Sequence, residues 1–547
     1  MERKVAGQVA REAIDPSAQG IAESRTVLFN SASPAEFALQ AGKVQNLRIA
    51  ARELNGIVIA PDQLFSFWKN LGRTSRRRGF VEGRELREGC VIPNVGGGLC
   101  QLSNALYDVA LRSGCEIVER HAHTQRVPGS TTQTGRDATI FWNYVDLRFR
   151  PRFRCQLRVV LSRGELLVDL FALDGSRPIA QDGREPIASC ESRVEAAETC
   201  ETCGVTKCFR NPAATSLARH GTTAWLLDKF EPEFDAWLQQ KRGQRDTVFL
   251  PLKSARLTSY RWNVNGIAAI EQAKFATVVR SLGSRRLATQ GAERQRALLR
   301  FDRQLAEAYA KRIPYIADHL VVNQNLLAHL WQRGDLAGRT FDVLMTRLPI
   351  AELEKTLDAA AVHHPQSRTI ADFRAPPEVR DAETVALSAA RYWITPHSHI
   401  ARIAGDRAIK LDWSVPTTQM AFAPRDTIVF PASTLARKGC YELREVVHEL
   451  NLKLKLGGPI LEAANFWDGV DVVRQNGDLC ESAAAFVLPA WVEHWPRRLL
   501  RAAAAGIPAI ASEACGLRGV PNVIEISAGD IGALRDAIVR LRRPIAA

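Results

Sequence analysis

The stretch GGGLCQLS at residues 96–103 places a cysteine where a glycine-rich loop enters a helix. Leu99, Leu102, Leu106 and Val109 recur at helical spacing, which predicts a helix with one buried face. Glycine permits backbone angles and close approaches that other residues do not. Because the N-terminal end of a helix stabilises a thiolate, Cys100 is a candidate nucleophile. A structural cysteine at a helix start is the alternative.

Two histidines and an aspartate follow this helix. Residues 116–120 alternate as a strand does, and His121 and His123 come next, on one face if the chain stays extended. Asp137 then opens the next extended segment. The order of Cys100, a histidine and Asp137 is typical of a thiol nucleophile, its base and the carboxylate that orients the base.

The surrounding sequence predicts an α+β domain over residues 25–180, after a polar arm at 1–24. A mostly apolar face over 41–54 indicates a second helix. Alternating stretches predict the strands of this domain. They lie at 56–60, 64–67, 116–120, 138–149, 157–161 and 166–171.

Several motifs in this region resemble a VanW-like domain. They are VQNLRIAA (44–51), LNG (54–56), FSF (65–67), RGF (78–80), GGGLCQLS (96–103), ERHAH (119–123) and GRDAT (135–139). The resemblance covers about residues 25–175. The family occurs with glycopeptide-resistance genes and in many other bacterial contexts. The resemblance implies the domain and no particular reaction, so the catalytic reading of Cys100 rests on the residues alone.

A polar segment at 181–215 separates this domain from the rest of the chain and is predicted to be a hinge. It holds four cysteines spaced C-x9-C-x2-C-x4-C, namely Cys190, Cys200, Cys203 and Cys208. Four thiolates suit a tetrahedral zinc site or an iron–sulfur cluster. The alternative is a cluster of reduced cysteines without a metal.

The remainder alternates between helical and strand-like stretches, which predicts two parallel α/β sheets over 216–412 and 413–547. In the second half, strands are expected at 427–431, 485–488 and 508–511, with helices at 441–450 and 499–505. Ligands of open α/β sheets bind outside the carboxyl ends of the strands. Arg437, Lys438 and Glu493 are predicted to lie there, where two cations suit a diphosphate.

This half resembles the nucleotide-sugar half of a retaining GT-B glycosyltransferase, through TLARKG (434–439), residues 493–508 and CG (515–516). The resemblance implies that Arg437 and Lys438 contact the donor diphosphate and that Glu493 contacts the sugar region. The family has a second carboxylate eight residues after the first, on the ribose, where this chain has Arg501. That departure leaves open a different donor, a degenerate site or a scaffold. His397 and His399 are expected near the cleft, either positioning an acceptor or phosphate or lying in an ordinary loop.

Composition agrees with a multidomain globular protein of 547 residues, 46% of them hydrophobic and 24% charged. The net charge of +14 suits an anionic substrate or peripheral contact with an anionic membrane, and no basic block resembles a nucleic-acid footprint. Without a signal segment or an 18-residue apolar run, the chain is expected in the cytoplasm.

Three functions fit these observations. The first is a glycosyltransferase that moves sugar from a nucleotide diphosphate sugar to a glycan, a peptidoglycan precursor or a metabolite. The second is a binding or scaffold protein with an inactive GT-B half. The third is cysteine-dependent acyl or amide transfer in the VanW-like domain.

Overall fold

The structure, a computed structural model, forms two compact units: residues 1–223 with 313–320 and 333–340, and the remainder of the chain. The predicted hinge and its four cysteines lie outside the residues that the structure describes. The described residues are 20–29, 37–87, 90–123, 136–162, 164–173, 222–254, 256–285, 287, 291–372, 374–415, 426–473, 478–481 and 483–542.

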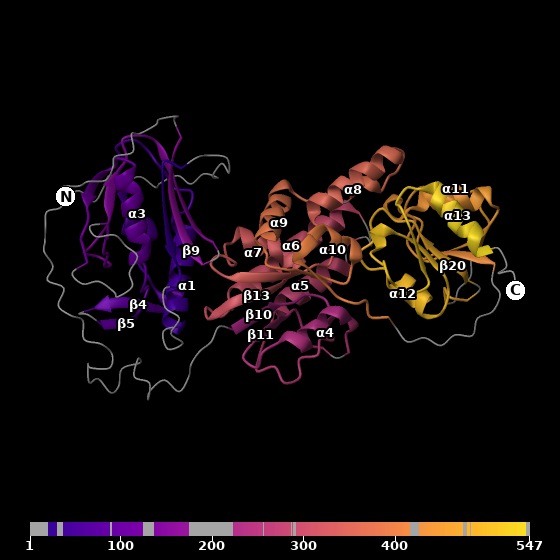
Figure 1. Ribbon diagram of the computed structural model, residues 1–547, viewed down its shortest axis with the longest axis horizontal. Helices are drawn as coiled ribbons and strands as arrows, with labels where there is room; N and C mark the ends of the chain where they lie inside the picture. The colour runs from indigo at the N-terminus through magenta and orange to yellow at the C-terminus, as the bar shows by residue number, and fades with distance from the viewer. Residues whose placement is uncertain are drawn as a thin grey trace. The chain divides into compact units, whose positions relative to one another are not determined.

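The first unit is built on a four-stranded antiparallel sheet in the order β1-β9-β8-β2. Helices α1 (Phe37–Leu54) and α3 (Cys100–Arg112) pack on it (Figure 1). The strands are β1 (Ala22–Val27), β2 (Val58–Ile59), β8 (Cys155–Leu161) and β9 (Glu165–Ala172). Strand β1 begins inside the predicted polar arm, because Ala22 to Val27 pair with β9 along their whole length.

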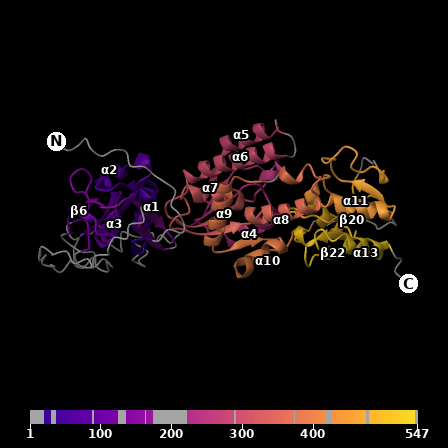
Figure 2. The same ribbon diagram turned by 90° about the horizontal axis from the view of Figure 1, so that it is seen from above.

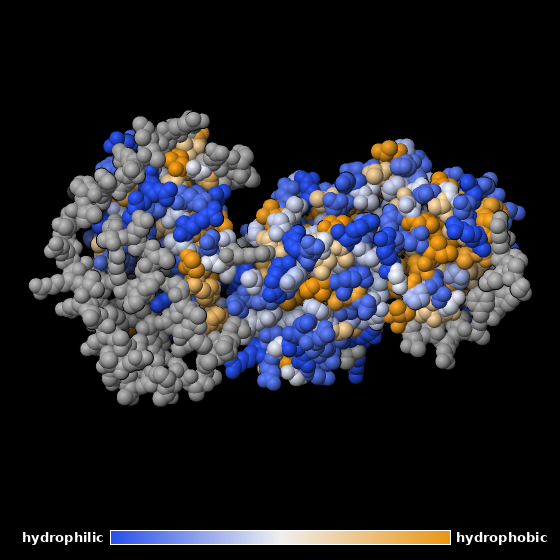
Figure 3. Space-filling model, in the orientation of Figure 1, coloured by the Kyte–Doolittle hydropathy of each residue, from blue (hydrophilic) through white to orange (hydrophobic). Residues whose placement is uncertain are grey.

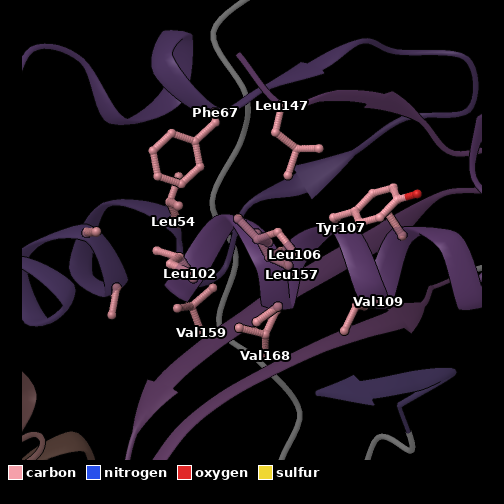
Figure 4. Packing of buried hydrophobic residues seen from close by; sticks show 14 of the residues in the cluster. Leu54, Phe67, Leu102, Leu106, Tyr107, Val109, Leu147, Leu157, Val159 and Val168 are labelled. Carbon is pink, nitrogen blue, oxygen red and sulfur yellow. The ribbon is translucent and has the colours of Figure 1, made fainter. Parts of the chain in front are cut away.

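Helix α3 buries the face that its spacing predicted. Leu102 and Leu106 lie in one apolar cluster with Leu157 and Val168 of the sheet (Figure 4). At about 25 cal/mol per Å² of buried apolar surface, each such leucine contributes roughly 2 kcal/mol. The position of Cys100 is therefore fixed by the packing of its own helix.

Two smaller sheets complete this unit. One has the order β3-β7-β6, from β3 (Phe65–Ser66), β7 (Arg148–Arg150) and β6 (Glu116–Glu119), and the other is the hairpin of β4 (Glu82–Arg87) and β5 (Cys90–Val95). The short helix α2 (Phe67–Leu71) follows β3 directly, because Ser66 Oγ accepts a hydrogen bond from Lys69 N as its N-cap.

The strand predicted over 138–149 is wrong apart from β7. The Asn104 side chain accepts a hydrogen bond from the Ala138 amide, and the Glu119 side chain accepts one from the Asp146 amide. The Thr139 amide donates to the His121 carbonyl. These bonds replace the ladder that a long strand would need.

Most residues of a seven-stranded sheet, in the order β12-β11-β10-β13-β14-β15-β16, belong to the second unit. Helices α5, α6, α7 and α9 pack against one another in sequence beside it (Figure 2). The strands are β10 (Thr222–Leu226), β11 (Thr247–Leu250), β12 (Ala269–Gln272), β13 (Ala317–Asn323), β14 (Thr340–Leu344), β15 (Trp393–Thr395) and β16 (Ala408–Lys410). The helices are α4 (Pro232–Lys241), α5 (Lys274–Arg285), α6 (Ala292–Ala310), α7 (Gln324–Gln332), α8 (Ile350–His363), α9 (Pro377–Ala389) and α10 (Ser398–Ala404).

A six-stranded parallel sheet follows in the order β19-β18-β17-β20-β21-β22. Helices α11 (Cys440–Glu449) and α13 (Ile531–Arg542) cover one face and α12 (Arg497–Ala504) the other (Figure 1). The strands are β17 (Thr427–Phe430), β18 (Lys453–Leu456), β19 (Val472–Val473), β20 (Ala483–Leu488), β21 (Ala509–Ser512) and β22 (Val523–Ile526).

The predicted pair of α/β sheets in the C-terminal part is thereby confirmed.

Polar and apolar residues are interspersed on the visible surface of this unit (Figure 3).

Candidate functional site

Two loops meet at the carboxyl edge of the six-stranded sheet. Lys438, in the loop after β17, donates from Nζ to Glu493 Oε2 over 2.9 Å and to the Val492 carbonyl over 3.0 Å. The Arg437 carbonyl accepts hydrogen bonds from the amides of Trp491 and Val492. The structure thus brings together Arg437, Lys438 and Glu493, the residues that the sequence placed at this edge.

Gly439 allows this close approach. Its φ of +76° is in the left-handed region, and a Cβ there would lie 2.1 Å from the Pro489 carbonyl oxygen. Any other residue would therefore clash with the loop after β20.

Two histidines form hydrogen bonds between the loop after β20, which carries Glu493, and the loops of the seven-stranded sheet. His397 donates from Nε2 to the Glu493 carbonyl over 2.9 Å, while Nδ1 accepts from Ile400 N. His494 accepts the Leu348 amide at Nε2, 3.2 Å away. Burial lowers the pKa of His397 to about 4. His397 is thus a neutral, buried link that holds the Glu493 backbone, and the carboxyl ends of both sheets contribute to this site.

Electrostatic interactions link the buried His494 to three cations of the second unit. Burial lowers the pKa of His494 well below the usual range, and the charges of Lys438, Arg347 and Arg437 lower it further. Arg347 also binds Glu383, with 2.7 Å between nitrogen and oxygen. The pKa of Glu493 is lowered because its pairing with Lys438 outweighs the opposing effect of burial. The site is a buried, charged cluster in which Lys438 and Arg347 are each paired with a carboxylate.

Arg501 points away from this cluster. Its guanidinium binds Asp478 over 2.6 Å, and Asp478 lies in the segment that leads into β20. The pair therefore lies toward the amino end of the sheet, and its members are half to one-third exposed.

The sequence analysis did not identify Arg347 as a site residue. Arg347 nevertheless follows β14 closely, just as Lys438 follows β17 and Glu493 follows β20. The sequence analysis also gave no role to His364, whose Nε2 lies 2.7 Å from Glu442 Oε1, the same oxygen that accepts from Trp491 Nε1. Because Trp491 immediately precedes the Val492–Glu493 segment, this buried pair stabilises the site loop.

In the first unit, Cys100, His123 and Asp137 converge. His123 Nδ1 lies 2.9 Å from Asp137 Oδ2, and the His123 amide donates to the same oxygen over 2.6 Å. Ser103 Oγ, one turn after Cys100, donates to the Cys100 and Ala138 carbonyls, which places the His123–Asp137 pair beside the start of α3. Cys100 is also among the groups that raise the pKa of His123. Arg120 holds the other carboxylate oxygen, Asp137 Oδ1, at 3.0 Å.

His121 does not join this cluster, which corrects the expectation that both histidines would share its face. His121 is half exposed and lies 3.4 Å from Glu119 Oε1. The reason is that β6 ends at Glu119, and the His123 amide is then bound by Asp137. The alternation of an extended strand therefore does not continue to His123.

Helix α3 fixes the positions of both Cys100 and the Asp137 segment. Ser103 Oγ donates to the Ala138 carbonyl over 2.5 Å, and Asn104 Oδ1 accepts the Ala138 amide over 2.7 Å. The loop before Cys100 packs tightly as well, since a Cβ on Gly98 would lie 2.1 Å from Lys43 Cγ. The sequence GGGLCQLSN therefore encodes the geometry around Cys100 as well as a helix start.

The charges within this cluster reinforce one another. Burial opposes protonation of His123, but its hydrogen bond with Asp137 and its interaction with Cys100 outweigh burial and raise its pKa to about 9. Burial also opposes ionisation of Asp137, yet His123 and Arg120 lower its pKa to about 2.

No group of three or more His, Cys, Asp or Glu side chains suited to a metal ion occurs within the described residues. Because Cys190, Cys200, Cys203 and Cys208 lie outside them, the zinc or iron–sulfur centre stays a prediction. Among the helices described, none has the length and apolar character needed to cross a membrane.

Residues 42–171 match the family model described as VanW like protein. This region is a VanW-like domain. The vancomycin B-type resistance protein VanW of Enterococcus faecalis (strain ATCC 700802 / V583) is 32% identical over 155 residues, 27% of this chain and 56% of that protein. The uncharacterized protein YoaR of Bacillus subtilis (strain 168) is 31% identical over 131 residues, 24% of this chain and 43% of that protein. The chain thus spans about half the length of these relatives.

Several solved glycosyltransferase structures are also similar to this chain. The apo lipopolysaccharide outer core galactosyltransferase WaaB is 11% identical with a TM-score of 0.34, covering 58% of this chain and 90% of its own. Sucrose-phosphate synthase from Thermosynechococcus elongatus is 15% identical with a TM-score of 0.36, covering 59% and 90%. Anabaena HepE in complex with UDP is 13% identical with a TM-score of 0.35, covering 59% and 89%. The architecture of the second unit is established here by its own two sheets.

Proposed function

We propose that the second unit binds a nucleoside diphosphate sugar where the carboxyl ends of its two sheets meet, and transfers the sugar to an acceptor. The observation that carries this proposal is that the Arg437 backbone and the Lys438 side chain are hydrogen-bonded to the loop of Val492 and Glu493, while the Leu348 amide, next to Arg347, donates to His494 of the same loop. Cations held at the carboxyl ends of parallel strands suit a diphosphate.

Each side chain then has a distinct task. Arg437 and Lys438 bind the diphosphate, with Arg347 adding positive charge from the other sheet. Glu493 orients Lys438 and reaches the sugar region of the donor. His397 is a positioning residue, because its hydrogen bond to the Glu493 carbonyl fixes the loop.

Arg501 stands where the family has a ribose-binding carboxylate, so this chain lacks that contact with the donor. A carboxylate that would bind ribose is replaced by an arginine, and this arginine pairs with Asp478 toward the opposite end of the strand. The nucleotide is therefore held mainly through its diphosphate, and discrimination among nucleosides is weak. The acceptor is a glycan, a peptidoglycan precursor or a metabolite, and the sugar keeps its anomeric configuration.

Sugar release from donors tests the proposal. The purified chain is incubated with uridine, guanosine, adenosine and thymidine diphosphate sugars, and free nucleoside diphosphate is measured. Glu493→Gln should slow release while nucleotide binding persists. Lys438→Ala should weaken binding about ten- to a hundredfold, because a charge-assisted contact is worth about 1.5–3 kcal/mol.

The matched control is Lys453→Ala, which removes an exposed lysine of the same sheet that pairs with Asp426. It should behave as the native chain does. Nucleotide binding without sugar release from any donor would favour the scaffold function instead.

A further inference from the structure

The first unit contains a group of side chains that donor binding does not involve: Cys100, His123 and Asp137. Cys100 begins α3, a helix of 13 residues, and is partly accessible to solvent. His123 and Asp137 come from two other segments, lie 2.9 Å apart, and are held at the first turn of this helix by the hydrogen bond from Ser103 Oγ to the Ala138 carbonyl. Because Nδ1 of His123 is bound to Asp137, Nε2 is the nitrogen that serves the thiol.

Asp137 is anchored for a positioning role. One oxygen binds both the ring and the backbone amide of His123, and the other binds Arg120. Arg120 also donates to the Asp137 carbonyl over 2.8 Å and stacks over the Tyr107 ring at 5.1 Å. A carboxylate so held fixes the tautomer and direction of the imidazole.

We propose that Cys100 is the nucleophile of an acyl-transfer site, with His123 as its proton carrier and Asp137 and Arg120 as positioning residues. The substrate is a carbonyl compound with a leaving group, that is an ester, a thioester or an amide. This proposal concerns the VanW-like domain and does not depend on the function proposed for the second unit.

The reaction balances with these groups and water or an amine. The Cys100 thiolate attacks the carbonyl carbon, the bond to the leaving oxygen, sulfur or nitrogen breaks, and His123 gives its proton to the leaving group. Water or an amine then attacks the thioester and gives a proton to His123. The carbon–sulfur bond breaks, which yields an acid or a new amide and restores the thiolate.

Other thiol chemistry fits the structure less well. A cysteine that attacks phosphate needs cations aimed at the anion, whereas Arg120 is committed to Asp137. Disulfide chemistry needs an accessible second thiol, and Cys115 and Cys155, the other cysteines of this unit whose side chains the structure describes, are buried. A proton carrier beside the sulfur matches acyl transfer, where the leaving group must be protonated.

The reactivity of Cys100 can be tested by labelling the cysteines of the native chain. Iodoacetamide at neutral pH, followed by peptide mass spectrometry, should modify Cys100 at least about tenfold faster than Cys115 or Cys155. The imidazole of His123, followed by NMR, should titrate near pH 9, and Cys100→Ser should lower that pKa because the Cys100 side chain contributes to the upward shift. An unreactive Cys100, or a His123 titration that Cys100→Ser leaves unchanged, would overturn the proposal.

Acylation with 4-nitrophenyl acetate tests the transfer step. Nitrophenolate should be released in a burst with the acetyl group on Cys100, and the burst should be absent in Cys100→Ser. His123→Gln should slow it about a hundredfold, because the thiol loses the group that accepts its proton during attack. The matched control, His121→Gln, should react as the native chain does. Equal losses in the two histidine variants, or acetyl groups spread over other side chains, would show that Cys100 is structural.

Discussion

The buried pair of Lys438 and Glu493 makes a quantitative prediction about the second unit. Its side chains are only 12% and 14% exposed, and the oxygen and nitrogen lie 2.9 Å apart. Lys438→Met keeps most of the aliphatic volume and removes the charge. Glu493 would then remain in the same loop with no cation paired to it directly.

The expected magnitude follows from this burial. Breaking a buried ion pair by removing one partner destabilises a protein by about 3–5 kcal/mol, while removing both partners is far less harmful. For a domain of this size, 1 kcal/mol corresponds to roughly 2 °C in unfolding temperature. Lys438→Met should therefore lower the unfolding temperature of the second unit by about 6–10 °C, and Lys438→Met with Glu493→Gln should restore most of that loss.

Differential scanning calorimetry of the full chain measures this change. The control is Lys453→Met, because Lys453 and Asp426 form an exposed pair, 52% and 65% accessible, in the same sheet. An exposed pair is worth less than about 1 kcal/mol. If Lys438→Met were no more destabilising than Lys453→Met, or if the double variant were worse than the single one, the pair would not be buried as described.

Three further predictions concern the first unit and the hinge. Asn46→Ala should destabilise the first unit by about 2–4 kcal/mol in thermal unfolding, because the Asn46 amide binds both backbone groups of Val81 and the Gly97 carbonyl; a loss below about 1 kcal/mol would contradict this. The folded-state pKa of His123, about 9, lies above its ordinary 6.5, so the stability it adds should be complete below about pH 6.5 and lost as pH rises through about 9. His123→Gln should abolish that dependence, and equal pH profiles of the two chains would refute it. Elemental analysis of anaerobically purified chain should find about one zinc, or iron with sulfide, per molecule, and a metal-free hinge that resists protease would rule the centre out.

Local patterns were sufficient for the main elements of the fold. The 3.6-residue spacing of leucines around residue 102 predicted α3, and short apolar runs predicted β17, β20 and β21. The donor-side residues were predictable because they follow parallel strands, whose carboxyl ends share one edge. The hairpin of β4 and β5 escaped detection, since its Glu, Arg and Asn residues mask the alternation of a strand.

Long-range contacts explain what the sequence alone could not decide. The choice of His123 over His121 depends on a hydrogen bond between the His123 backbone and Asp137, which spacing does not reveal. Arg347 lies about ninety residues before Arg437 and reaches the same histidine from another sheet. The direction of Arg501 depends on Asp478, which precedes β20 and has no motif to mark it.

The most direct test of the central claim is calorimetric titration of the full chain with uridine, guanosine, adenosine and thymidine diphosphates and their sugar conjugates. At least one of them should bind, and the affinity should fall about ten- to a hundredfold in Lys438→Ala while remaining unchanged in Lys453→Ala. Absence of binding to every nucleotide by folded protein, or binding that Lys438→Ala leaves intact, would contradict the assignment of a donor site at the carboxyl ends of the two sheets.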